Sequence, residues 1–238
     1  MNIARSFRDL TRIEKVIWFT SEGMILLSAL LFRESDFLTV IASLIGATAL
    51  IFVGKGDVLG QLLTIIFAVV YAVISYKCRY YGEMITYMGM TAPTALWAMI
   101  VWLKNPYSEK EVKVGHMTPT KWLLLVLGTI IATIIMWKIL GFFHTANLIV
   151  STLSVSTSFL ASMFTVLRSP YYAVCYAAND VVLIVLWVLA TLADMGNLPM
   201  VLCFVVFLVN DIYGFANWKR MRERQNSHEN LDKNDEKK

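Results

Sequence analysis

The stretch YGEMITYMGMTAPTALWAMIVWLKN, residues 81–105, is mostly apolar, is about one bilayer thick, and ends on an aromatic and basic edge. Its closing pattern returns in VVFLVNDIYGFANWKRM, residues 205–221. When Trp102 is aligned with Trp218, both stretches show an aromatic residue, a small residue, three further residues, Trp and then a cation. The chain is therefore predicted to be a duplicated membrane unit, with one polar and aromatic helix closing each copy.

The alignment pairs positions along one helical stripe of each stretch. Positions 90, 94, 97 and 101 share one face of a helix, as do positions 206, 210, 213 and 217. The pairs include Thr94 with Asn210 and Trp97 with Tyr213. This stripe supplies several of the candidate site residues named below.

The composition excludes a soluble domain. Of 238 residues, 58% are hydrophobic and only 16% are charged, which leaves too little polar surface for a soluble protein of this size. The apolar runs are continuous rather than alternating, so a porin-like barrel is also excluded. The expected fold class is an all-α polytopic membrane protein with eight transmembrane helices.

Eight apolar runs follow one another along the chain, each close to the ~20 residues that span a hydrocarbon core. A signal peptide is the alternative interpretation of the first run, but an interior Glu22 and the lack of an A-x-A site argue against it. An amphipathic arm is expected before these runs, and the charged tail after them is expected to be disordered. The predicted spans cover about 13–32, 37–54, 57–76, 83–103, 121–141, 145–166, 171–192 and 197–218.

Loop charge predicts the orientation. If all eight runs span the membrane, the side with both termini holds 17 of the 21 Lys and Arg residues. The other side holds only Arg33, Lys77, Arg79 and Lys138. The positive-inside rule then places both termini in the cytoplasm.

The order of the runs predicts the domain organisation. Two three-helix repeats, 37–104 and 145–218, are separated by a polar loop and a linker helix at 105–144. A shift of four spans restores the same orientation, so the repeats are expected to be parallel, related by an axis along the membrane normal. Residues 1–36 add an N-terminal arm and an extra helix, and residues 219–238 form a charged cytoplasmic tail.

The seventh run carries the sharpest set of candidate ligand residues. Tyr176, Asn179, Asp180 and Trp187 lie close to one helical stripe, and Asn179 and Asp180 fall ~12–14 Å deep, near the midplane. Buried polar groups in a membrane are candidate functional groups, and this combination suits a ligand with hydroxyls and a flat ring. The alternative is that these side chains hold neighbouring helices together.

Polar and aromatic side chains on three further runs complete the candidate substrate site. Pro93 breaks the backbone ladder of the fourth run at mid-membrane, where it can kink the helix. Packing between helices is an equally good interpretation for the residues of the last run. The further candidates are Gln61, Tyr87, Thr91, Thr94, Trp97, Asn210 and Tyr213.

Several classes of chemistry lack a sequence signal. Three cysteines and three histidines are scattered without metal-ligand spacing, and no HExxH, Walker or GxSxG motif occurs. No catalytic residue, metal or cofactor is therefore expected. The basic tail is expected to set orientation or to meet anionic lipid rather than nucleic acid.

The order and spacing of these motifs resemble the PnuC family of bacterial vitamin-precursor transporters, over roughly residues 37–224. The matching features are YGE at 81–83, Pro93 nine residues before Trp102, the WLKN close, the series Tyr172, Tyr176 and Asp180, and the final YGFANWKRM. The resemblance implies a SWEET-like arrangement of three-helix bundles, a homotrimer in the bacterial inner membrane, and facilitated diffusion coupled to a cytoplasmic kinase.

The resemblance also suggests the cargo. Nicotinamide riboside is the expected substrate, held between the repeats near the midplane by aromatic faces and hydrogen bonds. The sequence departs from the family pattern at Ala95, Ala98, Tyr172 and Tyr176, so thiamine or another vitamin or nucleoside stays an alternative. A small membrane-embedded enzyme or receptor subunit is the alternative from another functional class.

Overall fold

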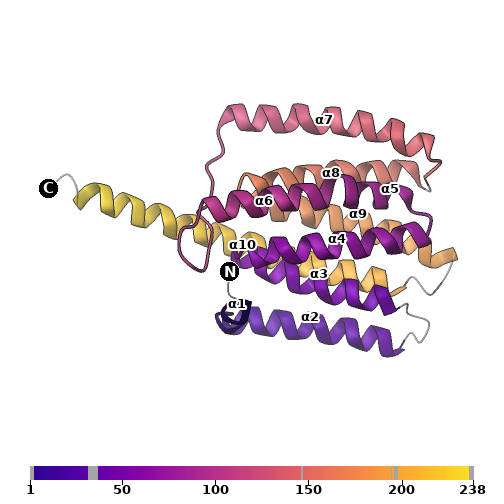
Figure 1. The fold of residues 1–238 in the computed structure, drawn as a ribbon, viewed down its shortest axis with the longest axis horizontal. Coiled ribbons are helices and arrows are strands. Elements are labelled where there is room, and N and C mark those ends of the chain that lie inside the picture. The colour runs from indigo at the N-terminus through magenta and orange to yellow at the C-terminus, as the bar shows by residue number, and fades with distance from the viewer. Residues whose placement is uncertain (1–2, 32–36, 146, 194, 196–197, 236–238) are drawn as a thin grey trace.

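The computed structural model describes residues 3–31, 37–145, 147–193, 195 and 198–235. The long helices run side by side, and the last one extends beyond the others at the end where both termini lie (Figure 1). In chain order the elements are α1 (Ile3–Arg8), α2 (Arg12–Leu31), α3 (Phe37–Lys55), α4 (Leu59–Lys77), α5 (Tyr81–Thr86), η1 (Tyr87–Thr91), α6 (Ala92–Lys104), α7 (Pro119–Phe142), α8 (Leu148–Val166), α9 (Tyr171–Ala193) and α10 (Leu198–Asp235).

Each of the eight predicted apolar runs is helical, which confirms the all-α membrane fold class. Within the described residues, seven helical segments are long and apolar enough to cross a membrane. The eighth predicted span, α2, is 20 residues long but carries Arg12, Glu14, Lys15 and Glu22. Its crossing of the membrane therefore stays a prediction.

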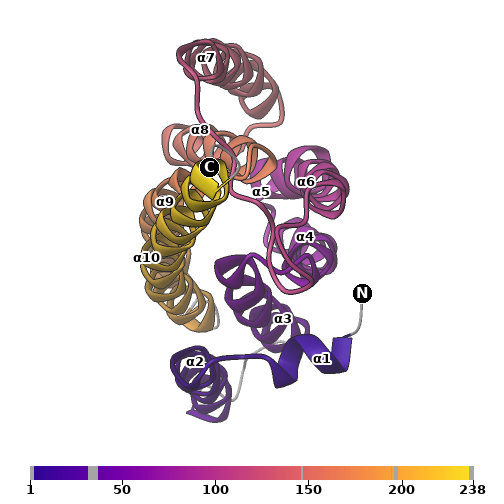
Figure 2. The ribbon, with the colours of Figure 1, turned by 90° about the vertical axis from the view of Figure 1, so that its left-hand side faces the viewer.

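The helices form two groups that meet along two seams. In one group α4 packs against α3 and against α5, η1 and α6, and in the other α9 packs between α8 and α10. The groups meet where α3 contacts α10 and where α6 contacts α8. Viewed from the end of the bundle, α7 lies at one edge beside α8, and α2 lies at the opposite edge (Figure 2).

A π-helical turn interrupts the helical run Tyr81–Lys104. The turn η1 directly precedes α6, whose second residue is Pro93. Proline has no N–H to donate to the preceding turn, so a local change in the hydrogen-bond ladder is expected here. The predicted disturbance at Pro93 is therefore a π-turn, a feature often found at functional sites.

The helices α3 and α8, which begin the two predicted repeats, end in the same way. Each ends in a cap in which one residue has left-handed backbone angles, Gly56 (φ 78°) after α3 and Arg168 (φ 56°) after α8. The N–H of Gly56 bonds the carbonyl of Val53, and the N–H of Arg168 bonds the carbonyl of Thr165, both at 3.0 Å. The N–H of the following residue bonds the carbonyl one residue earlier, Asp57 to Phe52 and Ser169 to Phe164. This pair of hydrogen bonds is the Schellman motif.

The prediction of a disordered tail is wrong for residues 219–235, because α10 continues to Asp235. Long-range contacts hold the start of this extension. The buried Gln225 accepts a hydrogen bond from the N–H of Val114 at 2.8 Å and donates to the carbonyl of Val112 at 3.1 Å. Arg224 also forms an ion pair with Glu111 of the same loop.

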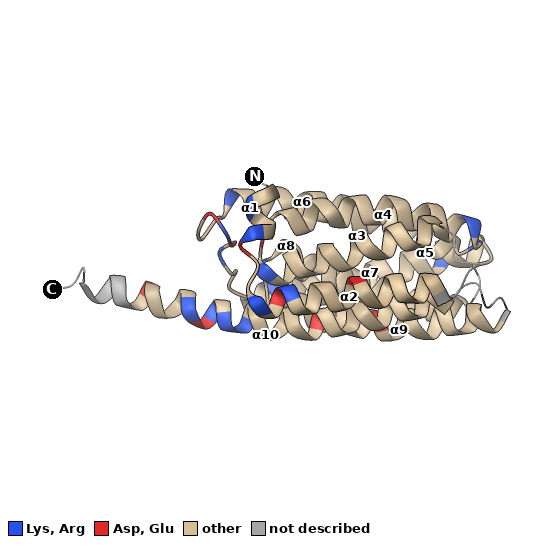
Figure 3. Ribbon diagram, turned by 90° about the horizontal axis from the view of Figure 1, so that it is seen from below, with Lys and Arg blue, Asp and Glu red and all other residues tan. Residues whose placement is uncertain are grey.

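Lys and Arg residues gather around α1, the loop after α6 and the emerging part of α10, at the end that carries the termini (Figure 3). We call this the charged end. Only a few acidic residues are seen along the rest of the bundle (Figure 3). The charged end is the side predicted to face the cytoplasm.

Candidate functional site

A cavity with a largely apolar surface and several polar side chains lies inside the bundle, between the two helix groups. Its volume is about 60 Å³, enough for a few water molecules, and we call it the central cavity. Its walls come from α3, α4, η1, α8, α9 and α10. The lining residues are Gly46, Ala49, Leu50, Val53, Gln61, Thr64, Phe67, Tyr87, Thr91, Ser158, Thr165, Tyr176, Asn179, Asp180, Phe207 and Asp211.

Two carboxyl groups lie next to each other on one wall of the central cavity. Asp180 on α9 and Asp211 on α10 are close enough to interact directly, and both are almost fully buried. Each keeps one oxygen, Oδ2, without a hydrogen-bond partner. Buried, unpartnered carboxyl groups are costly in a membrane protein, so this pair is suited to a cation or a hydrogen-bond donor.

Two amide side chains provide donors at the same cavity. Gln61, in the first turn of α4, is buried and its Nε2 has no partner. The Oδ1 of Asn179 accepts bonds from Ser154 at 3.2 Å and from Thr157 at 2.8 Å. These bonds orient the Asn179 amide and leave its Nδ2 as a donor for a ligand.

Aromatic rings form the remaining wall. The ring centroid of Phe67 lies 5.5 Å from that of Phe207 and 5.8 Å from that of Tyr87. Gly46 makes this packing possible, because a Cβ there would lie 2.3 Å from the Cζ of Phe207. The hydroxyl of Tyr176 lies 3.3 Å from that of Ser162. Aromatic faces of this kind suit a flat ring or an organic cation.

The structure brings six of the eleven predicted site residues to the central cavity. These are Gln61, Tyr87, Thr91, Tyr176, Asn179 and Asp180. Tyr87 and Thr91 stand at the two ends of η1, so the π-turn sets both side chains at the cavity.

Three of the other predicted residues lie away from the cavity for separate reasons. Trp97 is 53% exposed on the outside of α6. The Thr94 hydroxyl donates to the carbonyls of its own helix. Trp187 is fully buried elsewhere, where its indole N–H donates to the Tyr71 hydroxyl at 2.9 Å.

The last two predicted residues connect α10 to the N-terminal helix α2. Asn210 donates from Nδ2 to the Ser21 hydroxyl at 3.0 Å. The Tyr213 hydroxyl donates to a carboxylate oxygen of Glu14 at 3.2 Å. Both side chains therefore hold helices together, as the alternative interpretation of this run allowed.

Asp211 and Phe207 line the central cavity but lie outside the predicted set. They neighbour positions 210 and 206 of the predicted stripe, and adjacent residues on a helix differ by ~100° in direction. Thr91 aligns with Phe207, and Ala95 with Asp211, when Trp102 is set on Trp218. The same alignment, read one residue further along each helix, therefore includes both Phe207 and Asp211.

Comparisons with known proteins agree with this architecture. The model of the nicotinamide mononucleotide transporter family matches residues 36–220. The nicotinamide riboside transporter PnuC of Neisseria mucosa is 27% identical over 199 residues, which cover 81% of this chain and 76% of that protein. The protein of the same name from Haemophilus influenzae is 20% identical over 216 residues, covering 89% and 92%.

A solved structure has the same fold. The crystal structure of the vitamin B3 transporter PnuC superposes with a TM-score of 0.82 at 26% identity, covering 94% of this chain and 99% of that chain. The family model covers far more than half of the sequence, including every residue of the central cavity. The chain therefore belongs to the nicotinamide mononucleotide transporter family and is a membrane transporter rather than an enzyme.

Proposed function

We propose that this protein transports nicotinamide riboside across the membrane and that the central cavity is its binding site. The observation that carries the proposal is the set of unpartnered polar atoms on Gln61, Asp180 and Asp211, buried among aromatic rings. The curated relatives described above bear the name of the same substrate.

The chemistry of the substrate matches the cavity. Nicotinamide riboside combines a positively charged pyridinium ring, a carboxamide and a ribose. The carboxyl groups of Asp180 and Asp211 would stabilise the positive charge, and the rings of Tyr87 and Phe207 offer faces to the flat heterocycle. The amide of Gln61 is available to the carboxamide or to ribose hydroxyls.

The same lining favours the riboside over the mononucleotide. The mononucleotide adds a phosphate, which needs cationic or N–H donors to replace its water. The described residues that line the central cavity include no Lys, Arg or His, whereas they include the carboxyl groups of Asp180 and Asp211. A phosphate placed there would face two carboxyl groups and no cationic side chain among the described lining residues.

Binding requires the central cavity to widen. Ligand pockets usually measure ~300–1,000 Å³, whereas this one measures about 60 Å³. The two helix groups meet where α3 contacts α10 and where α8 contacts α5, η1 and α6, so movement of one group against the other is the simplest way to make room.

The proposed function also includes a transport mode, a membrane, an orientation and an assembly. Cytoplasmic termini agree with the positive-inside charge distribution, and a bacterial inner membrane agrees with the bacterial relatives. Transport by facilitated diffusion rests on the resemblance. The homotrimer and the link to a cytoplasmic kinase rest on the resemblance and stay predictions. A reporter fused after Arg224 should report the cytoplasm, and an exported reporter would contradict the orientation.

Direct binding to the purified protein tests the proposed substrate. We expect nicotinamide riboside to bind, nicotinamide mononucleotide to bind much more weakly, and Asp211→Asn to weaken binding of the riboside. Thr94→Ala is the matched control, because that hydroxyl bonds only the carbonyls of Met90 and Thr91, one turn back along the chain, and does not line the cavity. Equal binding of the mononucleotide, or tighter binding of thiamine in the same panel, would refute the assignment.

A further inference from the structure

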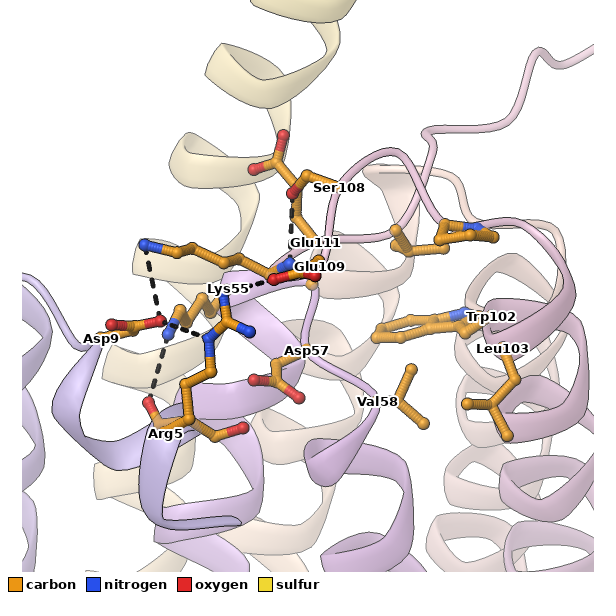
Figure 4. Close-up of a pocket in the computed structure, with 15 residues that line it drawn as sticks. Arg5, Asp9, Lys55, Asp57, Val58, Trp102, Leu103, Ser108, Glu109 and Glu111 are labelled. Atoms are coloured by element: carbon orange, nitrogen blue, oxygen red, sulfur yellow. Dashed lines mark hydrogen bonds and ion pairs between the residues drawn. The ribbon is translucent and has the colours of Figure 1, made fainter. Parts of the chain in front are cut away.

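A second and larger cavity lies at the charged end, where α1, the α3–α4 turn and the loop after α6 meet (Figure 4). We call it the end cavity, and its volume is about 430 Å³. Arg5 and Asp9 of α1 line it and form ion pairs with Glu109 and Lys110 of the loop. The N-terminal arm is thereby fixed as one wall of the end cavity.

Only a thin partition separates the end cavity from the central cavity. On α3, Val53 lines the central cavity and Lys55 lines the end cavity, and two residues of a helix rise by only ~3 Å. Trp102 lines the end cavity, while its indole N–H donates to the carbonyl of Thr165, which lines the central cavity, at 3.0 Å.

The core of the partition is a pair of tryptophans. The ring centroids of Trp102 and Trp218 lie 5.4 Å apart, and both side chains are completely buried. Tyr172 packs edge-on against Trp218 at 5.1 Å. Beside this pair the backbones of α3 and α10 approach closely, because a Cβ on Gly54 would lie 3.4 Å from the Cα of Gly214.

The two tryptophans make reciprocal hydrogen bonds across the seams between the helix groups. Trp218 on α10 donates from its indole N–H to the carbonyl of Val53 on α3 at 2.9 Å. Trp102 on α6 makes the corresponding bond to Thr165 on α8. Val53 and Thr165 occupy the same place in the caps that end α3 and α8. Each helix group therefore contributes one indole donor and one cap carbonyl.

Because each indole hydrogen bond joins the two helix groups, the contact between the tryptophans depends on how close the groups are. Moving one helix group away from the other at the charged end would break both indole bonds and part the two rings together. The central cavity would then open toward the end cavity. Side-chain motion within one group leaves both acceptor carbonyls in place, so it would not produce the same opening.

We propose that Trp102 and Trp218 form the gate that closes the central cavity at the charged end, and that the end cavity is the vestibule beyond it. The inference rests on the proposed transport function and deepens it. A cationic, hydroxylated nucleoside leaving the central cavity would pass between the two indole rings and enter a vestibule lined by polar and ionic side chains.

Site-directed thiol labelling tests the gate without using any substrate. Cys78, Cys175 and Cys203 are replaced by Ala, and Ser158→Cys places one thiol at the central cavity. A membrane-impermeant cationic methanethiosulfonate is then applied to vesicles, separately from each side, with the side of the termini identified by protease cleavage of a C-terminal tag. Trp102→Ala and Trp218→Ala should each speed labelling from the side of the termini by about tenfold, the change that ~1.4 kcal/mol gives.

A matched control separates the gate from general loosening of the fold. Trp187→Ala removes another fully buried tryptophan with an indole hydrogen bond, and it should leave labelling from the side of the termini unchanged. Trp102→Phe and Trp218→Phe, which retain a ring and lose the N–H, should give smaller increases. An unchanged rate in the Trp102→Ala and Trp218→Ala double variant, or an equal increase from both sides, would overturn the gate.

Substrate protection reports separately on the proposed function. Nicotinamide riboside should slow labelling of the introduced thiol in the background that retains both tryptophans. If protection is absent while the side-specific increase is present, the substrate assignment fails and the gate stands. If protection is present and the increase is absent, the gate fails and the substrate assignment stands.

Discussion

The helices α6 and α10 align at Trp102 and Trp218, yet their outer faces have different surroundings. On α10, Tyr213 is bonded to the extra helix α2, which covers this face. On α6, the aligned Trp97 is exposed on the outside of the bundle. The comparison shows that neither Trp97 nor Tyr213 lines the central cavity. On α10, the face that carries Tyr213 is where the N-terminal helix α2 packs.

The inward faces also differ, and that difference gives the central cavity its polarity. Asp211 on α10 lines the cavity, whereas the aligned Ala95 on α6 is a small buried residue. With Asp180 on α9, both carboxyl groups come from the second helix group, while Gln61 and Tyr87 of the first group offer neutral contacts. We therefore predict that the group of α8, α9 and α10 binds the positive charge of the substrate. The group of α3 to α6 orients the rest of the substrate.

The largest expected effect comes from the charged half of the cavity. Asp211→Asn should weaken binding of nicotinamide riboside by about 10- to 150-fold, because hydrogen bonds to charged groups contribute about 1.5–3 kcal/mol. Isothermal titration of the purified variant measures the change. Wild-type affinity in a folded Asp211→Asn protein would show that the carboxyl pair does not hold the substrate.

A smaller effect is expected from the neutral half. Gln61→Ala removes an uncharged donor, for which ~0.5–1.5 kcal/mol corresponds to a loss of about 2- to 12-fold. The same titration applies, with Thr94→Ala as the unchanged reference. A loss larger than that of Asp211→Asn would reverse the assignment of roles to the two helix groups.

Asn210→Ala should alter stability rather than binding. Loss of the bond to Ser21 leaves a buried hydroxyl without this partner, at a cost of about 1 kcal/mol in the free energy of unfolding. Thermal unfolding in detergent should show the decrease, while affinity for the riboside should stay at the wild-type value. A clear drop in affinity without loss of stability would return Asn210 to the substrate site.

The smallest effect is expected at Trp97. Its side chain is exposed on the outside of α6, so Trp97→Leu should change neither affinity nor unfolding temperature beyond error. Binding and thermal unfolding are measured on the same preparation. A weakened affinity would mean that this face meets the substrate in another arrangement of the helices.

These comparisons also show what the sequence allowed us to predict. Helices over the eight continuous apolar runs could be predicted, and helical spacing indicated that Tyr176, Asn179 and Asp180 lie close together. Asp211 did not follow, because adjacent residues on a helix differ by ~100° in direction and the sequence does not show which stripe faces inward. The helical extension of α10 could not be predicted, because Gln225 is held by Val114, more than a hundred residues away in the sequence.

The central claim is that the acidic pair of the central cavity recognises the positive charge of the substrate. The most direct measurement compares nicotinamide riboside with its uncharged 1,4-dihydro form, in the wild type and in Asp211→Asn. The two ligands share the ribose and the carboxamide and differ mainly in charge. We predict that the wild type prefers the cation by about tenfold or more and that Asp211→Asn loses most of this preference. An equal preference in both proteins would contradict the account.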